Sequence, residues 1–198
     1  MTKIFAHRGA SAYAPENTME AFELAAKQGA DGIELDVHVT KDGEVVVTHD
    51  EKIDRVSNGS GFIKDMTLRE LKRLSFHNHM ESYVGAGIPT LREVLEYVST
   101  TNMDVNIELK TGIYWYPQIE EKTAFIVQET GMHDRVIYSS FNHHSIAKIK
   151  EIDSTAETAW LFSDVILNVE QYAKANGVEG LHPAVYLSLI HISEPTRP

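Results

Sequence analysis

The sequence predicts an α/β fold with a mostly parallel sheet, either open or closed into a barrel. Short apolar segments typical of strands alternate with segments of helical periodicity along most of the chain. Alternating strands and helices form parallel sheets covered by helices. A hydrophobic content of 42% is enough for a core. The 198 residues indicate one domain, which is short for a barrel because β/α barrels usually need about 250 residues.

The first unit of the alternation is a strand over residues 4–6 followed by a helix. We expect Asn17 to be the N-cap of this helix, because Glu20 follows it at the spacing of a capping box. Gly29 is in the position expected for the C-cap. The loop between strand and helix therefore lies between residues 7 and 16.

Two predicted strands come next, followed by a long segment that does not continue the strand–helix alternation. Strands are predicted over residues 32–39 and 45–48, joined by a turn at Lys41-Asp42-Gly43. Residues 51–87 break the alternation and contain a short helix, which we expect Thr67 to cap, with Glu70 completing a Thr-x-x-Glu capping box. We interpret this segment as a small insertion into the barrel.

The alternation resumes after the insertion. Thr90 and Glu93 form a second Thr-x-x-Glu capping box, and the apolar residues that follow have the spacing of an amphipathic helix. The remaining predicted strands cover residues 105–109, 136–140, 158–162 and 178–181, and the remaining helices cover residues 119–130, 143–152 and 165–176.

The last residues differ from the rest of the chain. Residues 187–197 read LSLIHISEPTR, and one choice of codons for this run back-translates to a transposon adapter used in sequencing libraries. We therefore expect residues 1–186 to form a partial barrel domain that lacks its last β/α unit or units, and residues 187–198 to be a non-native tail.

Composition excludes several classes of function. The formal net charge of −11 argues against nucleic acid as a partner, because phosphate backbones are bound by clustered Lys and Arg. Cysteine is absent, so neither a disulfide framework nor a thiolate metal site is expected. No apolar run approaches the roughly 18 residues of a transmembrane helix, and no secretory signal is evident at the start of the chain. A cytoplasmic location is the simplest expectation, and the oligomeric state is left open.

Carboxylates occur in pairs on two predicted strands. Glu34 and Asp36 lie two residues apart and so share one face of their strand, as Glu108 and Lys110 do on theirs. A charged face turned to water would suit an antiparallel sheet better than a parallel one, whose faces are usually both covered. In a barrel these carboxylates would converge inside, where they need a cation. Three oxygen ligands suit Mg²⁺, Ca²⁺ or Mn²⁺.

Histidines stand at the ends of two strands. His7 and His49 both follow a short apolar run, and active sites of barrels form at the C-terminal ends of the strands. Histidine can donate and accept protons near neutral pH. Arg8 can bind phosphate oxygens bidentately, and Lys110 offers a point charge beside Glu108, either for a ligand or as a simple ion pair.

The order and spacing of these motifs resemble those of the glycerophosphodiester phosphodiesterases. The similarity runs from about Phe5 to about Pro183. It rests on His7-Arg8-Gly9, Pro15-Glu16-Asn17-Thr18, Glu34-x-Asp36, His49-Asp50, Asp54-Arg55, Asn58-Gly59-Ser60-Gly61, Thr67-Leu68-x-Glu70-Leu71, Ile88-Pro89-Thr90-Leu91, Glu108-x-Lys110 and Ser140-Phe141.

The resemblance implies a TIM-type (β/α) barrel of the phospholipase C-like phosphodiesterase kind and a role for each motif. It implies that one divalent metal ion is bound by Glu34, Asp36 and Glu108. It implies that His7 and His49 act as the acid–base pair and that Arg8 and Lys110 hold the phosphate. By the same resemblance, Glu16 helps to organise the site and Phe141 lines the pocket.

The implied reaction is metal-dependent hydrolysis of small glycerophosphodiesters, such as glycerophosphocholine or glycerophosphoethanolamine, to glycerol 3-phosphate and an alcohol. Either histidine can take either proton-transfer role, and the nucleophile is water or the substrate's own glycerol hydroxyl. Two alternatives stay open at this point. One is a related phosphodiesterase that acts on lysophospholipids or phosphoinositides, and the other is an inactive barrel that only binds its ligand.

Overall fold

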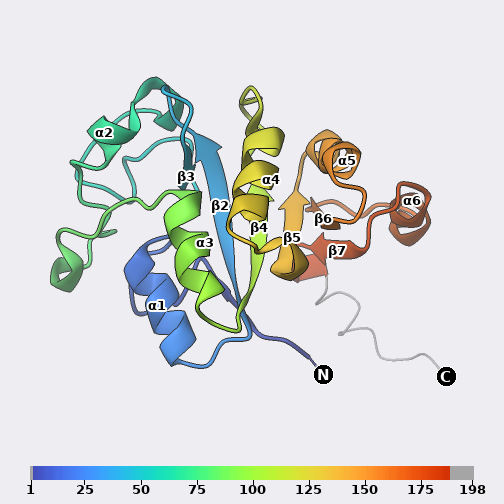
Figure 1. Cartoon of the computed structure of the whole chain (residues 1–198), viewed down its shortest axis with the longest axis horizontal. Helices are drawn as coiled ribbons and strands as arrows, with labels where there is room; N and C mark the ends of the chain where they lie inside the picture. Colours follow the sequence, from blue (N-terminus) through green and yellow to red (C-terminus); the bar gives the residue numbers. More distant parts are fainter. Residues whose placement is uncertain (1, 188–198) are drawn as a thin grey trace.

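The computed structural model describes residues 2–187 of the chain. Residues 188–198, most of the predicted non-native tail, lie outside the described residues. Figure 1 shows a curved sheet with helices along one side of it.

Six parallel strands run through the sheet in the order β1-β2-β4-β5-β6-β7, and β3 pairs antiparallel with β2. The order follows the chain, as in a TIM barrel, so the fold class expected from the sequence is confirmed. The path of the described strands ends at β1 on one side and at β7 on the other, short of the eight strands of a complete barrel. The strands are β1 (Phe5–His7), β2 (Gly32–Val39), β3 (Val45–Val47), β4 (Asp104–Leu109), β5 (Val136–Ser140), β6 (Glu157–Phe162) and β7 (Gly180–Pro183).

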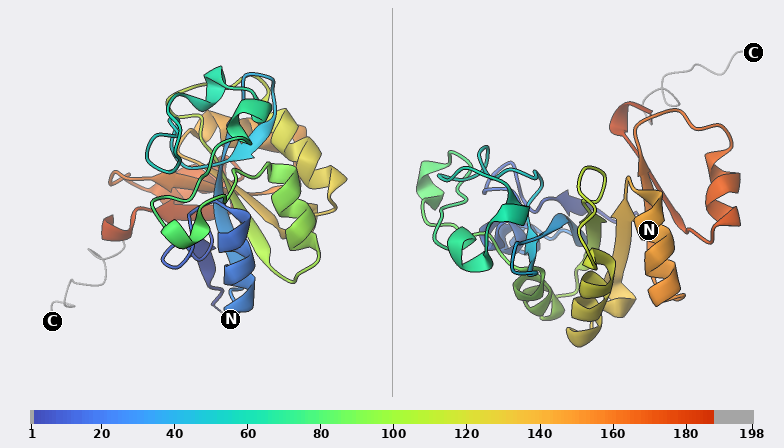
Figure 2. Two further views of the ribbon diagram at one scale, coloured as in Figure 1. Left: turned by 90° about the vertical axis from the view of Figure 1, so that its left-hand side faces the viewer. Right: turned by 90° about the horizontal axis from the view of Figure 1, so that it is seen from above.

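Helices cover the outer, convex face of the sheet (Figure 2, right). The main apolar core lies between them and the strands. It buries outward-facing residues such as Leu35 and Ile107 against helix residues such as Phe22, Leu95 and Ile146. The helices are α1 (Met19–Lys27), α2 (Leu68–Leu71), α3 (Leu91–Ser99), α4 (Ile119–Glu129), α5 (His143–Ile152) and α6 (Val169–Ala175), with short 3₁₀ turns at Ile63–Asp65, Glu81–Tyr83 and His133–Arg135.

The insertion at residues 51–87 has a small core of its own. Ile53, Val56, Ile63, Leu71 and Phe76 are buried there, together with Val46 of β3 and Ile88. Both predicted Thr-x-x-Glu capping boxes are present, at the starts of α2 and α3. The insertion is thus a compact unit fixed against the end of β3, beside the carboxyl ends of the strands (Figure 1).

The structure corrects three of the predicted boundaries. The N-cap of α1 is Thr18, whose hydroxyl accepts from the Ala21 amide, and Asn17 has a left-handed backbone (φ 56°). Helix α6 begins only at Val169, and β7 begins two residues later than expected. The prediction of Asn17 as the cap was wrong. The Asn17 side chain instead binds Asp36 of the sheet, and Thr18, also a residue type favoured at N-caps, caps the helix.

Candidate active site at the carboxyl rim of the sheet

Three carboxylates converge on the inner face of the sheet. Asp36 of β2 is in register with Glu108 of β4, and Glu34 lies two residues before Asp36 on the same face. One carboxylate oxygen from each of the three residues lies within 4.8 Å of the others. Asp36 is 1% exposed and Glu108 is 8% exposed. The sequence prediction that these three side chains meet is therefore matched by the geometry.

Burial and the crowding of negative charge raise the pKa of two of these carboxylates. Burial, together with the charges of Asp36 and Glu108, raises the pKa of Glu34 from 4.5 to about 8. Burial and the charge of Asp36 also raise the pKa of Glu108. The Oδ1 atom of Asp36 is buried and has no hydrogen-bond partner among the described residues. Three carboxylates buried this close together repel one another, and a cation bound between them would offset the repulsion. Three hard oxygen donors that include an unsatisfied Asp36 oxygen fit a divalent ion such as Mg²⁺ or Ca²⁺.

Cationic side chains flank the carboxylates on two sides. Lys110 Nζ donates to Glu108 Oε1 at 2.9 Å and lies 3.6 Å from Asp36 Oδ1. Burial lowers the pKa of Lys110, but Glu108 and Asp36 outweigh it and the net change is upward. Arg8 Nε lies 3.6 Å from Asp36 Oδ2, and the Arg8 amide donates to Glu34 Oε2 at 3.0 Å. Lys110 therefore stays charged, and both cationic side chains lie where they can also meet an anion.

The backbone at Arg8 is shaped by its neighbours. Arg8 adopts a left-handed conformation (φ 58°), and Gly9 follows at φ 78°. A Cβ atom on Gly9 would lie 2.8 Å from backbone and side-chain atoms of Ala21, so this turn requires glycine. The tight turn points the Arg8 amide at Glu34 and keeps α1 close to the sheet.

His49 forms hydrogen bonds through both its ring and its backbone carbonyl. Its Nδ1 lies 2.6 Å from Asp50 Oδ1. A carboxylate accepts, so Nδ1–H donates, and Nε2 has no hydrogen-bond partner within residues 2–187. The His49 carbonyl accepts from His38 Nε2 at 3.1 Å, and His38 Nδ1 lies 2.9 Å from the Tyr116 hydroxyl. Burial lowers the pKa of His38 to about 4, so its ring is neutral and its Nδ1 accepts from Tyr116.

His7 also lies beside the acidic cluster. Its Nε2 lies 3.7 Å from Glu34 Oε2. Partial burial lowers the pKa of His7, and the guanidinium of Arg8 lowers it further. His7 ends β1 and His49 follows β3, and these two strands both pair with the edge of β2 that lies opposite β4. Both histidines therefore enter the site from the same edge of β2.

Most of the residues singled out from the sequence meet at this rim. They are His7, Arg8, Glu16, Glu34, Asp36, His49, Glu108 and Lys110. Glu16 accepts from Arg8 Nη1 at 3.0 Å. Phe141 directly follows β5 and is 50% exposed, and its part in a pocket wall stays a prediction.

Sequence reasoning missed three residues of the site. Asn17, read as a helix cap, donates from Nδ2 to Asp36 Oδ2 at 2.9 Å. His38 was given no role although it shares the inner-strand alternation of Glu34 and Asp36, a signal that could have identified it. Arg55 bridges Glu16 and Asp50, and no local sequence pattern indicates this contact.

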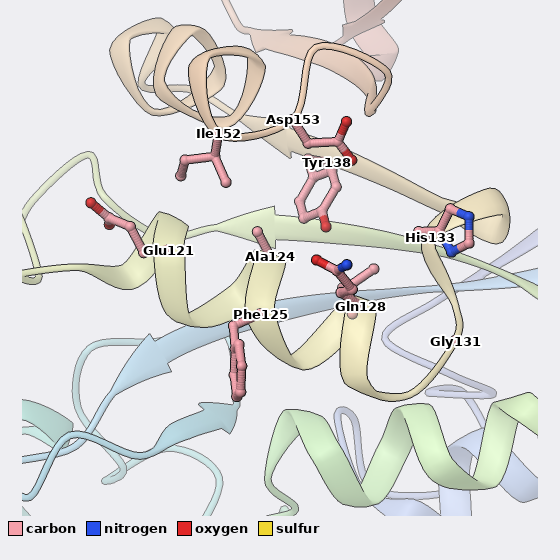
Figure 3. Close-up of a pocket in the computed structure, with 10 residues that line it drawn as sticks. Glu121, Ala124, Phe125, Gln128, Gly131, His133, Tyr138, Ile152 and Asp153 are labelled. Atoms are coloured by element: carbon pink, nitrogen blue, oxygen red, sulfur yellow. The ribbon is translucent and has the colours of Figure 1, made fainter.

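A separate groove lies on the outer face between α4 and α5, with a volume of about 690 Å³ (Figure 3). Phe125 and Ile152 line it, and Tyr138 forms part of its floor. Its carboxylates have partners at the surface, since Glu121 pairs with Lys148 and Asp153 accepts from Thr155. The groove therefore lacks the convergent charges seen at the rim.

No helix within residues 2–187 is both long enough and apolar enough to cross a membrane.

Comparison with known proteins identifies a family. Residues 7–195 match the model of the glycerophosphoryl diester phosphodiesterase family. A glycerophosphodiester phosphodiesterase of Bacillus altitudinis is 48% identical over 187 residues, which cover 93% of this chain and 76% of the relative. One of Caldanaerobacter subterraneus subsp. tengcongensis is 44% identical over 190 residues, covering 96% and 78%.

Solved structures agree with the sequence comparison. A phosphodiesterase of Oleispira antarctica, solved in complex with the product sn-glycerol-3-phosphate, superimposes with a TM-score of 0.84 at 29% identity, covering 98% of this chain and 81% of that one. A glycerophosphodiester phosphodiesterase of Thermotoga maritima superimposes with a TM-score of 0.72 at 31% identity, covering 92% and 74%.

Proposed function

Because the chain belongs to the glycerophosphoryl diester phosphodiesterase family and is an enzyme of that class, we propose that it hydrolyses small glycerophosphodiesters in a metal-dependent reaction. The substrates are compounds such as glycerophosphocholine or glycerophosphoethanolamine. The products are glycerol 3-phosphate and the free alcohol. The product bound to the Oleispira antarctica phosphodiesterase has the same glycerol 3-phosphate half.

The convergence of Glu34, Asp36 and Glu108 is the observation that carries the proposal. A cluster in which burial and like charge raise the pKa of Glu34 to about 8 is costly without a cation. We assign these three carboxylates as the ligands of one divalent ion, Mg²⁺ or Ca²⁺, with Mn²⁺ as a further candidate. When bound, the ion neutralises charge on the phosphate oxygens and so makes the phosphorus accessible to a nucleophile.

Arg8 and Lys110 bind the phosphate in this proposal. Both lie at the edge of the cluster, within 3.6 Å of Asp36 oxygens. Each already has a carboxylate partner in the structure, so the approach of a phosphate exchanges one anion for another. Their positive charges stabilise the additional negative charge that develops in the transition state.

His7 and His49 transfer the protons. One ring accepts a proton from the attacking hydroxyl group, and the other donates a proton to the departing oxygen as its bond to phosphorus breaks. For attack by water the balance is one P–O bond formed and one broken. The proton of the water remains on one histidine and the alcohol carries away the proton of the other. General acid–base catalysis of this kind contributes about 10²–10⁴-fold in rate.

The test is release of glycerol 3-phosphate from glycerophosphocholine by the purified chain, first with EDTA and then with added Mg²⁺ or Ca²⁺. We expect EDTA to abolish release and the metal to restore it. We expect His7→Ala and His49→Ala each to lower kcat by at least ~10²-fold with a near-unchanged thermal unfolding midpoint. Unchanged turnover in either histidine variant would refute the acid–base assignment, and exclusive cleavage of long-chain lysophospholipids would refute the substrate assignment.

A further inference from the structure

Arg55 reaches the active site from the insertion. It stands in a turn between Ile53 and Val56, which are 0% and 3% exposed in the small core of the insertion. The Val56 and Ser57 amides both donate to the Ile53 carbonyl, so the backbone of this turn is fixed. The Arg55 side chain is 43% exposed and extends toward the strand ends.

One guanidinium binds two carboxylates along two of its edges. Arg55 Nη1 and Nη2 donate to Glu16 Oε2 and Oε1 at 2.9 and 2.8 Å. Arg55 Nε and Nη2 donate to Asp50 Oδ2 and Oδ1 at 2.7 and 3.2 Å. Glu16 belongs to the loop between β1 and α1, whereas Asp50 follows β3. Arg55 therefore joins the loop of Glu16, 39 positions away in the sequence, to Asp50, five positions away.

Each of the two carboxylates also contacts a residue of the proposed catalytic apparatus. Glu16 Oε1 accepts from Arg8 Nη1 at 3.0 Å, and Asp50 Oδ1 lies 2.6 Å from His49 Nδ1. The contacts form one continuous series, His49–Asp50–Arg55–Glu16–Arg8. The guanidinium of Arg55 is at the centre of this series. It is linked to His49 through Asp50 and to Arg8 through Glu16.

We propose that Arg55 is a positioning residue that fixes the ring orientation and tautomer of His49 through Asp50, and the guanidinium of Arg8 through Glu16. This inference rests on the proposed function, because it gives His49 and Arg8 the roles assigned there. It makes the insertion a part of the active site. A residue that orients a ligand or base through hydrogen bonds, without contacting the substrate, acts in this way. Its loss typically lowers activity by about 10–100-fold.

A purely structural role for Arg55 is the competing explanation. If the role is structural alone, loss of these bidentate contacts lowers the free energy of unfolding and leaves the His49 tautomer unchanged. A positioning role affects the His49 ring and the turnover number instead. The two explanations are therefore separable by the property measured.

Four variants of the full chain test the proposal. Arg55→Gln removes the charge, and Arg55→Lys keeps the charge but lacks the fork needed to bind two carboxylates bidentately. Asp50→Asn removes the charge beside His49 and offers its Nδ1 either an acceptor oxygen or a donor NH₂ group, so that it can bond either tautomer. Arg69→Gln is the matched control, since Arg69 is an exposed arginine of the same insertion, on α2.

The first measurement is the tautomer of His49, from the ¹⁵N shifts of its ring in the protein without metal or substrate. We expect the form with a proton on Nδ1 and none on Nε2 to dominate in the parent chain and in Arg69→Gln. We expect a mixture of tautomers in Arg55→Gln and in Asp50→Asn. In the double variant Arg55→Gln/Asp50→Asn the spectrum should equal that of Asp50→Asn alone, because Arg55 acts through Asp50.

The second measurement is steady-state hydrolysis. We expect Arg55→Gln to lower kcat by roughly 10–100-fold, Arg55→Lys to recover part of the loss, and Arg69→Gln to match the parent. A folded Arg55→Gln variant with the parent tautomer and the parent kcat would overturn the proposal. If Arg55→Gln does not fold, the same two outcomes are read from Arg55→Lys.

Failure of the two proposals can be told apart. A parent chain that hydrolyses no glycerophosphodiester contradicts the proposed function. The tautomer measurement needs no turnover and still supports or overturns the positioning role. Parent activity combined with unaltered His49 shifts in the Arg55 variants contradicts the positioning role alone.

Discussion

One row of residues in register runs across the sheet from β2 to β7, and its charge differs between the two ends. In register across neighbouring strands it contains Asp36 on β2, Glu108 on β4, Ser139 on β5, Ala159 on β6 and Gly180 on β7. All five lie on the same face, because paired residues in a ladder point the same way. One end of the row is charged, and the other end has small neutral residues.

The comparison shows how the register of neighbouring strands can create a binding site. Neighbouring strands are about 4.8 Å apart, so carboxylates in register on two adjacent strands are brought close enough to share a cation. The charged end is stabilised by Lys110, Arg8 and Asn17 around the carboxylates. The small end is held by packing, with Ser139 and Ala159 both fully buried. Substitutions at the two ends should therefore affect different properties.

The largest effect is expected at the charged end. Asp36→Asn keeps the size of the side chain and an oxygen for Asn17 Nδ2, but removes the charge of the most buried carboxylate. We expect the affinity for Mn²⁺, measured by titration, to fall sharply and kcat/KM to fall by about 10²–10³-fold, the usual cost of losing one group that stabilises charge in an active site.

Ser139→Ala is the matched control in the same row. The Ser139 hydroxyl is buried without a hydrogen-bond partner in the described part of the chain, so its loss should leave both Mn²⁺ affinity and stability near the parent values. If Asp36→Asn bound Mn²⁺ as tightly as Ser139→Ala, the charge of Asp36 would not contribute to metal binding.

The second effect concerns pH and stability without metal. The pKa of Glu34 is about 8 in the folded chain, because of burial and the charges of Asp36 and Glu108, against 4.5 ordinarily. Between these values the folded state keeps a proton that the unfolded state has lost. The stabilisation is therefore complete below pH 4.5 and is lost as the pH rises through 8. We expect the free energy of unfolding in EDTA to fall with pH over this window.

The slope of that decline identifies its source. One proton corresponds to a slope of about 1.4 kcal/mol per pH unit at most. Glu34→Gln should reduce the slope by close to that amount, with urea unfolding between pH 5 and 8 as the measurement. An unchanged slope in Glu34→Gln would mean that the pKa of Glu34 is not raised in the folded chain.

The sequence predicted the charged end well because its signals are local. The spacing of Glu34 and Asp36 within one strand was enough to place both on one face, and the bounds of β2 and β5 agree with the predicted ones. The capping boxes at Thr67 and Thr90 are contained within four residues each and were also confirmed.

Contacts between distant segments could not be predicted in the same way. The bond from Asn17 to Asp36 spans 19 positions, the bond from Arg55 to Glu16 spans 39, and that between His38 and Tyr116 spans 78. Each depends on how loops fold back over the rim. A helix-capping rule applied to Asn17 gave the wrong cap for that reason.

The smallest effect is expected at the neutral end. A Cβ atom on Gly180 would lie 2.7 Å from the Cβ of Ala159 on the neighbouring strand, so Gly180→Ala should destabilise the fold by about 1–3 kcal/mol through overpacking. The double variant Ala159→Gly/Gly180→Ala moves the methyl group across the ladder and should recover most of the loss. Both changes are measured by urea unfolding, with Mn²⁺ affinity unaffected because the carboxylates lie on other strands. A destabilisation that the double variant does not relieve would assign the cost to the backbone of β7 and not to side-chain contact within the row.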